Sequence, residues 1–371
     1  MEQKFRVVKR SIDARQRTLK VNLTVLTDES GRPLPKDAPI PLYTAPHFKD
    51  VHNAKHSVAI IGAGPAGLFA ALTLLEQGIK PIIFERGKEV SERKKDIATL
   101  NRNQGLNTES NYCFGEGGAG TFSDGKLYSR SKKRGNMQRV MELFHHFGAS
   151  DTVLYEAHAH IGSDKLPSII RAMRECIIQH GGEIHFNSCV DAVLLRELMR
   201  DKKSLLGTIL AIGHSAHDTY QMLLDEGVLL ENKGFAMGVR AEHPQTLINR
   251  LMYHDPSEEL IRLIGNASYS LVTQVQGRGV YSFCMCPGGF VVPAATGPNQ
   301  VVVNGMSPSN RGSKWSNSGM VVEVRPEDLP GSDVFNVMRF QEEMEQTAYV
   351  NGGATQVAPA QRMNDFVNRK M

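Results

Sequence analysis

The stretch "SVAIIGAGPAGLFAALTLLEQGIKPIIFERG", residues 57–87, constrains the fold more than any other part of the chain. Gly62, Gly64 and Gly67 form G-x-G-x-x-G between an apolar run and an apolar helical pattern, and a second apolar run ends at Glu85. In such a unit the first glycine permits a tight turn, the second lets the backbone approach a pyrophosphate, and the third lets the helix pack on the strand. The helix N-terminus then favours the phosphate charge, and the acidic residue accepts a hydrogen bond from a ribose hydroxyl. We therefore predict a dinucleotide-binding βαβ unit.

The same apolar run is long enough to raise the question of a membrane span. Its glycines and Pro65 interrupt it and Glu76 follows it, so a strand, a turn and a buried helix explain it better. The first residues, "MEQKFRVVKRSIDARQR", carry charges where a signal peptide needs an apolar core. A net charge of +4 is too small to indicate a nucleic acid or membrane partner, and five cysteines in 371 residues indicate reduced thiols. We expect a cytoplasmic protein without a membrane partner.

A second glycine-rich stretch, "FGEGGAGTFSDGKL" at residues 114–127, has five glycines. Bare backbone of this kind permits positive φ angles and close approach of a ligand to N–H groups. An NAD-binding domain does not need such a loop, whereas the isoalloxazine ring of a flavin needs a flat site lined by backbone. The "ERG" at residues 85–87 is also typical of the FAD-binding version of the fold. The cofactor is therefore predicted to be FAD.

Particular side chains of this loop are candidates for flavin contacts. Ser123 and Asp124 are expected to hydrogen-bond to the flavin tail or ring edge. Lys126 is a candidate for the ring edge where positive charge stabilises reduced flavin, and the alternative for it is a solvent-exposed lysine. The predicted cofactor-binding residues are Gly62, Gly64, Pro65, Ala66, Gly67, Glu85, Arg86, Gly117, Gly118, Gly120, Thr121, Ser123, Asp124, Lys126 and Gly213.

The chain resembles a known family, the bacterial uncharacterised FAD-dependent dehydrogenases among the glutathione-reductase-like NAD(P)/FAD-dependent oxidoreductases. The matching stretches are "VAIIGAGPAGLFAA", "FGEGGAGTFSDGKL", "LAIGHSAHDT", "GVRAEHPQ", "YSFCMCPGGFVVPA", "VVNGMS" and "PAQRMNDF". The resemblance implies FAD, an oxidoreductase fold and an extra N-terminal domain, but no substrate. It also implies a glycine-rich segment after "PAQRMNDF" that closes over the flavin. We therefore expect this chain to lack that segment, to lose FAD on gel filtration and to aggregate.

The fold class is predicted to be α/β, with four regions. Residues 1–50 alternate apolar and polar residues and are expected to form a small N-terminal α+β domain, residues 56–235 a Rossmann-like FAD-binding domain, residues 236–330 an antiparallel β-rich substrate or cap domain, and residues 331–371 a polar tail. Helices are expected near 136–147 and 166–180 and a strand over "EIHFNSCVDAVLL". The link from Leu194 to Ile209 is shorter than expected for a hairpin and a returning strand. The lysines and arginines of the N-terminal region indicate a solvated strand face or an RNA-docking module.

Catalytic candidates lie in two segments. In "LAIGHSAHD", Gly213 is expected in a turn, and His214 and His217 could carry protons because imidazole titrates near neutral pH; surface or turn histidines are the alternative. In "GVRAEHP", Arg240 and Glu242 share one strand face and could orient an anionic substrate, with His243 beside them. An exposed, salt-bridged strand is the alternative there.

The cysteines indicate packing more than chemistry. Cys284 and Cys286 form C-x-C in a strand pattern, which places both thiols on one face and suits neither a close disulfide nor a zinc site. Packing is the favoured interpretation, and redox exchange with the flavin is the alternative. Cys113, Cys176 and Cys189 are expected to be buried small hydrophobes, and no metal site is predicted.

These features together predict an FAD-dependent oxidoreductase that transfers hydride between the flavin and a small substrate. Outside the two glycine-rich stretches described above, the sequence has no G-x-G-x-x-G, so NAD(P)H is expected to bind only transiently, at the flavin face. The alternatives are an RNA-modifying flavoprotein and a flavin-binding module without turnover. The substrate and the oligomeric state do not follow from the sequence.

Overall fold

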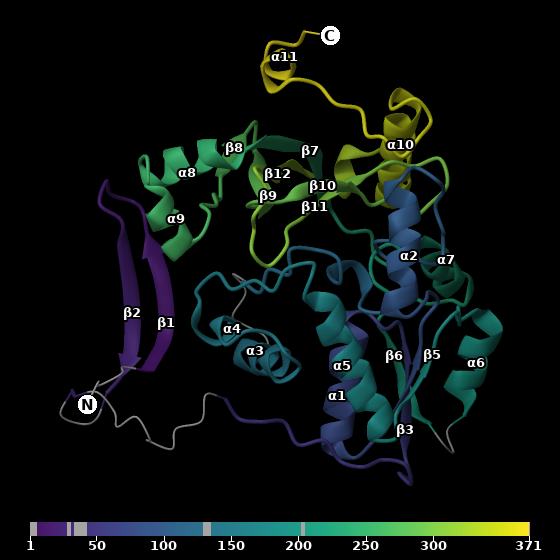
Figure 1. The fold of residues 1–371 in the computed structure, drawn as a ribbon. Coiled ribbons are helices and arrows are strands. Elements are labelled where there is room, and N and C mark those ends of the chain that lie inside the picture. The colour runs from purple at the N-terminus through teal and green to yellow at the C-terminus, as the bar shows by residue number, and fades with distance from the viewer. Residues whose placement is uncertain (1–5, 28–30, 33–42, 129–134, 202–204, 371) are drawn as a thin grey trace.

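A four-stranded parallel sheet forms the base of the molecule. The computed structural model describes residues 6–27, 31–32, 43–128, 135–201 and 205–370 (Figure 1). The strand order is β5–β4–β3–β6, and every neighbouring pair is parallel. Helix α1 connects β3 to β4, so the predicted strand–turn–helix–strand order is confirmed. The bounds are β3 Ser57–Ile61, α1 Pro65–Gln77, β4 Lys80–Phe84, β5 Glu183–His185 and β6 Leu205–Leu210.

The largest apolar core lies between this sheet and helices α1 and α5 (Leu166–Gln179), which run side by side (Figure 1). Leu72 and Met173, one from each helix, are fully buried. Burial of each such side chain contributes about 1.5–3 kcal/mol. Val51 is also fully buried in this core, and its N–H donates to the carbonyl of His180 over 2.8 Å. Val51, which lies between the predicted N-terminal and FAD-binding domains, thus packs with the sheet.

The connection from β5 to β6 differs from the prediction. The run "EIHFNSCVDAVLL" was expected to be one strand, but β5 ends at His185 and a helix, α6 (Ala192–Arg200), follows. Asp191 caps this helix by accepting the N–H of Leu194 over 2.8 Å. The cap and the helical spacing of the apolar residues outweigh the strand-like character of the run. Strand β6 then pairs with β3, and α7 (His217–Asp225) follows as predicted.

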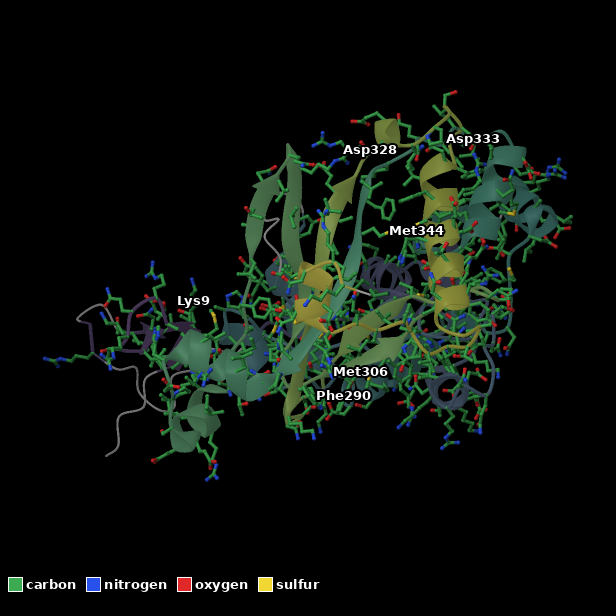
Figure 2. All side chains as sticks on the ribbon, turned by 90° about the horizontal axis from the view of Figure 1, so that it is seen from above. Lys9, Phe290, Met306, Asp328, Asp333 and Met344 are labelled. Atoms are coloured by element: carbon green, nitrogen blue, oxygen red, sulfur yellow. The ribbon has the colours of Figure 1, made fainter. Side chains whose placement is uncertain are left out.

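The second half of the chain forms the predicted antiparallel sheet, with strand order β7–β12–β9–β8. Its central strand, β12, was not among the strand-like runs identified from the sequence. A separate hairpin, β10–β11, pairs Phe290 with Met306, and Figure 2 shows these two side chains next to each other. The bounds are β7 Phe235–Pro244, β8 Val272–Val275, β9 Arg278–Cys286, β10 Phe290–Pro293, β11 Val303–Met306 and β12 Trp315–Val324.

The N-terminal region is simpler than predicted. Strands β1 (Arg6–Asp13) and β2 (Lys20–Leu26) form an antiparallel hairpin. The described residues up to 50 contain no helix, so the expected helical part of an α+β domain is not found there. Arg10 holds the hairpin against α4 through an ion pair of 2.7 Å with Glu156 (Figure 1). A hairpin alone buries too little apolar surface to fold by itself, which explains its need for this contact.

The remaining elements are connectors and covers. No helix in the described ranges is long and apolar enough to cross a membrane. These elements are α2 Val90–Asn101, η1 Gly118–Gly120, α3 Met137–His146, α4 Thr152–Tyr155, α8 Gln245–Tyr253, α9 Glu258–Ile264, η2 Pro326–Asp328, α10 Asn336–Asn351 and α11 Met363–Val367.

Candidate functional site

A cavity of about 490 Å³ opens at the carboxyl ends of the parallel strands. The last residues of β3, β4 and β6, which are Ile61, Phe84 and Leu210, line it. This edge of a parallel sheet is where α/β folds bind ligands, and the volume is in the range of small-molecule sites. The other lining residues come from the two glycine-rich segments and from the turns after β4, β5 and β6: Gly62, Gly64, Pro65, Ala66, Glu85, Arg86, Cys113, Phe114, Gly115, Gly118, Ala119, Gly120, Ser188, Cys189, Val190, Ala211, Ile212, Gly213, His214, Ser215, Ala216, Thr219 and Tyr220.

The turn after β3 requires its glycines for three different reasons. Gly62 has φ +106°, and a Cβ atom there would lie 2.4 Å from the carbonyl oxygen of Ala211. A Cβ atom on Gly67 would lie 1.9 Å from the carbonyl oxygen of Gly62, so the third glycine sets the contact of helix and strand. At Gly64 the nearest atom to a Cβ is 3.8 Å away, so this position borders open space in the cavity. The N-terminus of α1 begins there, where an anion is stabilised.

The glycine-rich loop packs against this turn and continues the same wall of the cavity. Gly118 has φ +60°, and a Cβ atom on it would lie 3.1 Å from Cα of Gly64. The N–H of Gly117 donates to the carbonyl of Ala63 over 2.8 Å, which joins the loop to the turn. Gly118 and Gly120 line the cavity, whereas Gly117 does not. The two glycine-rich segments therefore face each other with bare backbone.

Glu85 connects the three loops around the cavity. Its carboxylate accepts the N–H groups of Ala63 at 2.8 Å, Gly87 at 2.9 Å and Gly115 at 3.0 Å, and the side chain is buried. Oε1 accepts two of these N–H groups and Oε2 accepts one, so Oε2 keeps a further lone pair, and the residue lines the cavity. The contact predicted between Glu85 and a ribose therefore remains a proposal. The structure shows in addition that Glu85 holds the three loops together.

Arg93, which the sequence analysis did not single out, organises the glycine-rich loop. This fully buried guanidinium donates to five backbone carbonyls and to the hydroxyl of Thr121, which accepts at 3.1 Å. Burial lowers the pKa of Arg93 to about 10, and the nearby Glu85 and Glu116 carboxylates oppose this shift. The five carbonyls are those of Asn111 at 2.8 Å, Tyr112 at 3.0 Å, Gly115 at 3.3 Å, Glu116 at 2.7 Å and Gly118 at 2.8 Å.

Arg86 lines the cavity but is already paired. Its guanidinium donates to Glu109 over 2.8 and 3.0 Å and to Asp218 over 2.9 and 2.8 Å. It also lies 4.4 Å from the ring centroid of Phe114. These contacts tie the turn after β4 to the start of α7.

The later part of the loop turns away from this cavity. Thr121 and Ser123 use their hydroxyls on backbone groups of the loop itself, and neither lines the cavity. Asp124 is buried and pairs with Lys126 at 2.6 Å and with Arg311 at 3.0 Å. The Lys126 side chain is 32% exposed and its ammonium group is bound to Asp124, so the lysine is both partly exposed to solvent and paired. None of these four residues is among those that line the cavity.

The catalytic candidates are not brought together. Gly213 and His214 line the cavity, whereas His217 forms an ion pair with Glu342 of α10. Glu242 is exposed on β7. His243 is buried, and its two ring nitrogens lie 2.8 Å from the hydroxyl of Ser316 and 2.9 Å from that of Tyr269; burial lowers its pKa.

Arg240 is already bound within the antiparallel sheet. Its guanidinium donates to the side chains of Asn317 and Asn304 and to the carbonyl of Cys284. Arg240 and Glu242 lie two positions apart in the regular strand β7, and their action on one ligand stays a prediction.

Some lining residues were missed. Cys189 is exposed and Cys113 and Cys176 are partly exposed, so the expectation of three buried cysteines is wrong. Cys113 and Cys189 both line the cavity. Cys113 immediately precedes the glycine-rich loop, and that position was the available signal.

Comparison with known proteins identifies the cofactor. Residues 234–371 match the family described as FAD-dependent protein, C-terminal domain-like, residues 55–110 match an FAD binding domain, and residues 2–27 match a domain of unknown function. An uncharacterised protein of Clostridium beijerinckii is 38% identical over 383 residues, which cover 98% of this chain and 71% of that protein. The chain belongs to the family of the clostridial protein, and its cofactor is FAD.

Solved structures with similar chains include FqzB and CtdE in complex with FAD. FqzB is 13% identical with a TM-score of 0.27, and the alignment covers 81% of this chain and 61% of FqzB. CtdE is 12% identical with a TM-score of 0.24, and the alignment covers 80% of this flavoprotein and 69% of CtdE.

The cavity of the flavoprotein fits a dinucleotide. Gly64 and Gly118 line the cavity at the helix N-terminus where the pyrophosphate belongs, and Oε2 of the buried Glu85 keeps a lone pair for the ribose. The walls contributed by Phe84, Phe114 and Val190 are apolar, as a flat ring system requires.

Proposed function

We propose that this flavoprotein is an oxidoreductase that transfers hydride between FAD and a small substrate, with NAD(P)H as a transient electron donor. The observation that carries the proposal is the pair of glycine segments that contact each other at Gly64 and Gly118 and line one cavity with bare backbone. Bound FAD supplies the hydride chemistry. The residues of the chain bind and orient it and control access of water.

Particular residues have separate roles in this proposal. The turn from Gly62 to Gly67 holds the pyrophosphate, and Glu85 holds the first ribose. Gly115, Gly118 and Gly120 give the cofactor a backbone-lined wall that Arg93 keeps rigid. His214 is the candidate proton carrier because it is the histidine that lines the cavity. Residues 236–330, which contain the antiparallel sheet, are proposed to hold the substrate.

Anaerobic reduction tests the proposal. We expect NADH or NADPH to bleach the visible absorbance of the FAD-loaded protein, and at least one oxidant from a panel of quinones, enones, imines and disulfides to restore it. The Gly64→Val variant, which should not bind FAD, is the control for free flavin. A protein that binds FAD but is reduced by neither nicotinamide and reoxidised by no member of the panel would favour a binding module instead.

A further inference from the structure

Two cysteine sulfurs and one ammonium group meet where the glycine-rich loop contacts the antiparallel sheet. Nζ of Lys126 lies 3.5 Å from Sγ of Cys286 and 3.8 Å from Sγ of Cys284. The same Nζ lies 2.6 Å from the Asp124 carboxylate. The lysine follows the cavity-lining Gly120 by six positions in the chain. This thiol pair is therefore attached directly to the loop that forms one wall of the cofactor cavity.

A bulge in β9 gives the two cysteines their arrangement. Cys286 pairs with Asn317 and Phe283 with Gly319, so Cys284 and Met285 together oppose a single residue of β12. Cys284 has φ +48°, a conformation that residues other than glycine rarely adopt. Such backbone persists when its surroundings enforce it, and it is concentrated at functional sites.

The packing around the pair leaves one cysteine accessible and the other enclosed. Cys284 is partly exposed, whereas Cys286 is fully buried. A Cβ atom on Gly305 of the β10–β11 hairpin would lie 2.9 Å from Sγ of Cys286 and 2.3 Å from Arg240. The bare backbone at Gly305 therefore lets the buried sulfur and the guanidinium lie close together.

The charges around the pair favour a thiolate. Lys126, Arg240 and Arg311 are cations, and Asp124 is the carboxylate between two of them. A hydrogen bond from the Cys286 thiol, with the charges of Lys126 and Arg240, lowers the pKa of Cys284 to about 5 against the effects of burial and Asp124. The same hydrogen bond and burial raise the pKa of Cys286. His160, which also faces Asp124 and Arg311, has its pKa lowered by burial.

We propose that Cys284 and Cys286 are a redox-active thiol pair that reduces a small disulfide bearing carboxylate groups. The Cys284 thiolate attacks one sulfur of the disulfide, the S–S bond breaks, and one thiolate leaves and takes a proton from water. Cys286 then loses its proton to water and attacks the Cys284 sulfur, which forms the Cys284–Cys286 disulfide and releases the second thiolate. The pair loses two electrons and the substrate gains two. Lys126, Arg240 and Arg311 would attract the carboxylates.

The disulfide returns to the dithiol by gaining two electrons and two protons. Reduced FAD would supply the electrons, and only this return step rests on the proposed function. The reaction of the thiols with a disulfide does not depend on it, so the two proposals can fail separately.

Dithiobis(nitrobenzoate), a disulfide with two carboxylates, tests the pair in the full chain with and without FAD. We expect the peptide containing both cysteines to lose two hydrogens in mass, to carry no nitrobenzoate and to resist alkylation until reduced. Cys286→Ser should stop at a mixed disulfide on Cys284. A wild-type protein that keeps a stable mixed disulfide on that peptide, or that leaves the peptide unmodified, would overturn the proposal.

The pH dependence of alkylation by iodoacetamide supplies a measurement without an added disulfide. Cys189, which is exposed and whose pKa is raised mainly by burial, is the internal reference. Between pH 6 and 8 its rate should rise about tenfold per unit, while that of Cys284 should change less than about threefold.

Variants at Lys126 test the origin of the thiolate. Lys126→Met should restore a steep pH profile to Cys284, and Lys126→Arg should keep a flat one, because the charge remains. A steep profile for Cys284 in the wild-type protein would contradict the thiolate and with it the proposal. Failure of NADH and NADPH to reduce FAD would bear only on the proposed function.

Discussion

At the scale of the residue, buried charges rather than glycines determine how the loop is held. Arg93 lies in "SERKK", which in sequence has the character of an exposed charged run, yet its side chain is fully buried and bound to five carbonyls. The glycines supply conformational freedom, which by itself gives a flexible loop. The guanidinium fork supplies the fixed geometry because its donors point in set directions. Such a role cannot be predicted from local sequence, since it depends on carbonyls about 20 residues away.

The Arg93→Lys variant tests this role. A lysine keeps the charge but has three donors and no fork, so at least two carbonyls lose their partner. We expect the free energy of unfolding to fall by about 2–4 kcal/mol, measured by urea denaturation. The exposed neighbour Lys94, changed to alanine, is the control and should alter stability by less than about 0.5 kcal/mol. If the two variants are equally stable, Arg93 does not hold the glycine-rich loop as described.

Glu116 gives the protein a specific pH dependence. Burial, opposed by the Val90 N–H and the charge of Arg174, raises the pKa of Glu116 to about 7, and one of its buried oxygens has no hydrogen-bond partner. The folded state therefore holds this proton more tightly than the unfolded state. Its stabilising contribution is complete below about pH 4.5 and is lost as the pH rises to about 7, by an upper limit of about 3 kcal/mol.

The Glu116→Gln variant isolates this contribution. The amide cannot titrate, so the variant should become more stable relative to the wild-type protein as the pH rises from 5 to 8. Urea unfolding at several pH values measures the difference between the two proteins, in which titrations common to both cancel. A difference that does not change with pH would show that Glu116 is ionised normally in the folded state.

At the scale of the element, the sequence predicted strands and helices well where the apolar residues repeat with a clear helical or strand period. The βαβ unit, α5 and the strands β7 and β9 have strong apolar patterns, and the structure places them as expected. Strand β12 was missed because its first half is polar: Ser316, Asn317 and Ser318 are fully buried there. The Ser316 hydroxyl and Asn317 Oδ1 bind His243 and Arg240 of β7, whereas Nδ2 of Asn317 has no hydrogen-bond partner among the described residues. Local sequence carries no sign of those partners.

The turn before α1 allows a prediction about two glycines three positions apart. A Cβ atom on Gly67 would overlap the carbonyl of Gly62, whereas a Cβ on Gly64 would make only an ordinary van der Waals contact of 3.8 Å with Cα of Gly118. We expect Gly67→Ala to lower the free energy of unfolding by about 2–3 kcal/mol and Gly64→Ala to change it by less than about 1 kcal/mol. Thermal unfolding without FAD measures both. If the two alanine variants unfold alike, the helix does not pack on the strand as described.

At the scale of the whole molecule, the cavity joins segments that are remote in sequence. The glycine patterns predicted the turn after β3 and the loop after residue 114, and both line the cavity. The turns at 188–190 and 210–216 complete it, and their part depends on the strand order of the sheet. The thiol pair depends on a bulge and on contact between the loop and the second sheet. Packing of distant elements determines such features, and one-dimensional patterns do not encode them.

The central claim is that FAD binds in the cavity between the two glycine segments. Titration of the FAD-free protein with FAD, followed by flavin fluorescence, tests it most directly when the wild-type protein is compared with Gly64→Val. The valine side chain enters the space assigned to the pyrophosphate, and thermal unfolding of the FAD-free variant checks that the fold is kept. We predict one FAD bound per wild-type chain and at least about a hundredfold weaker binding by the variant, about 2.7 kcal/mol. Equal affinity of the two proteins would contradict this placement of the cofactor.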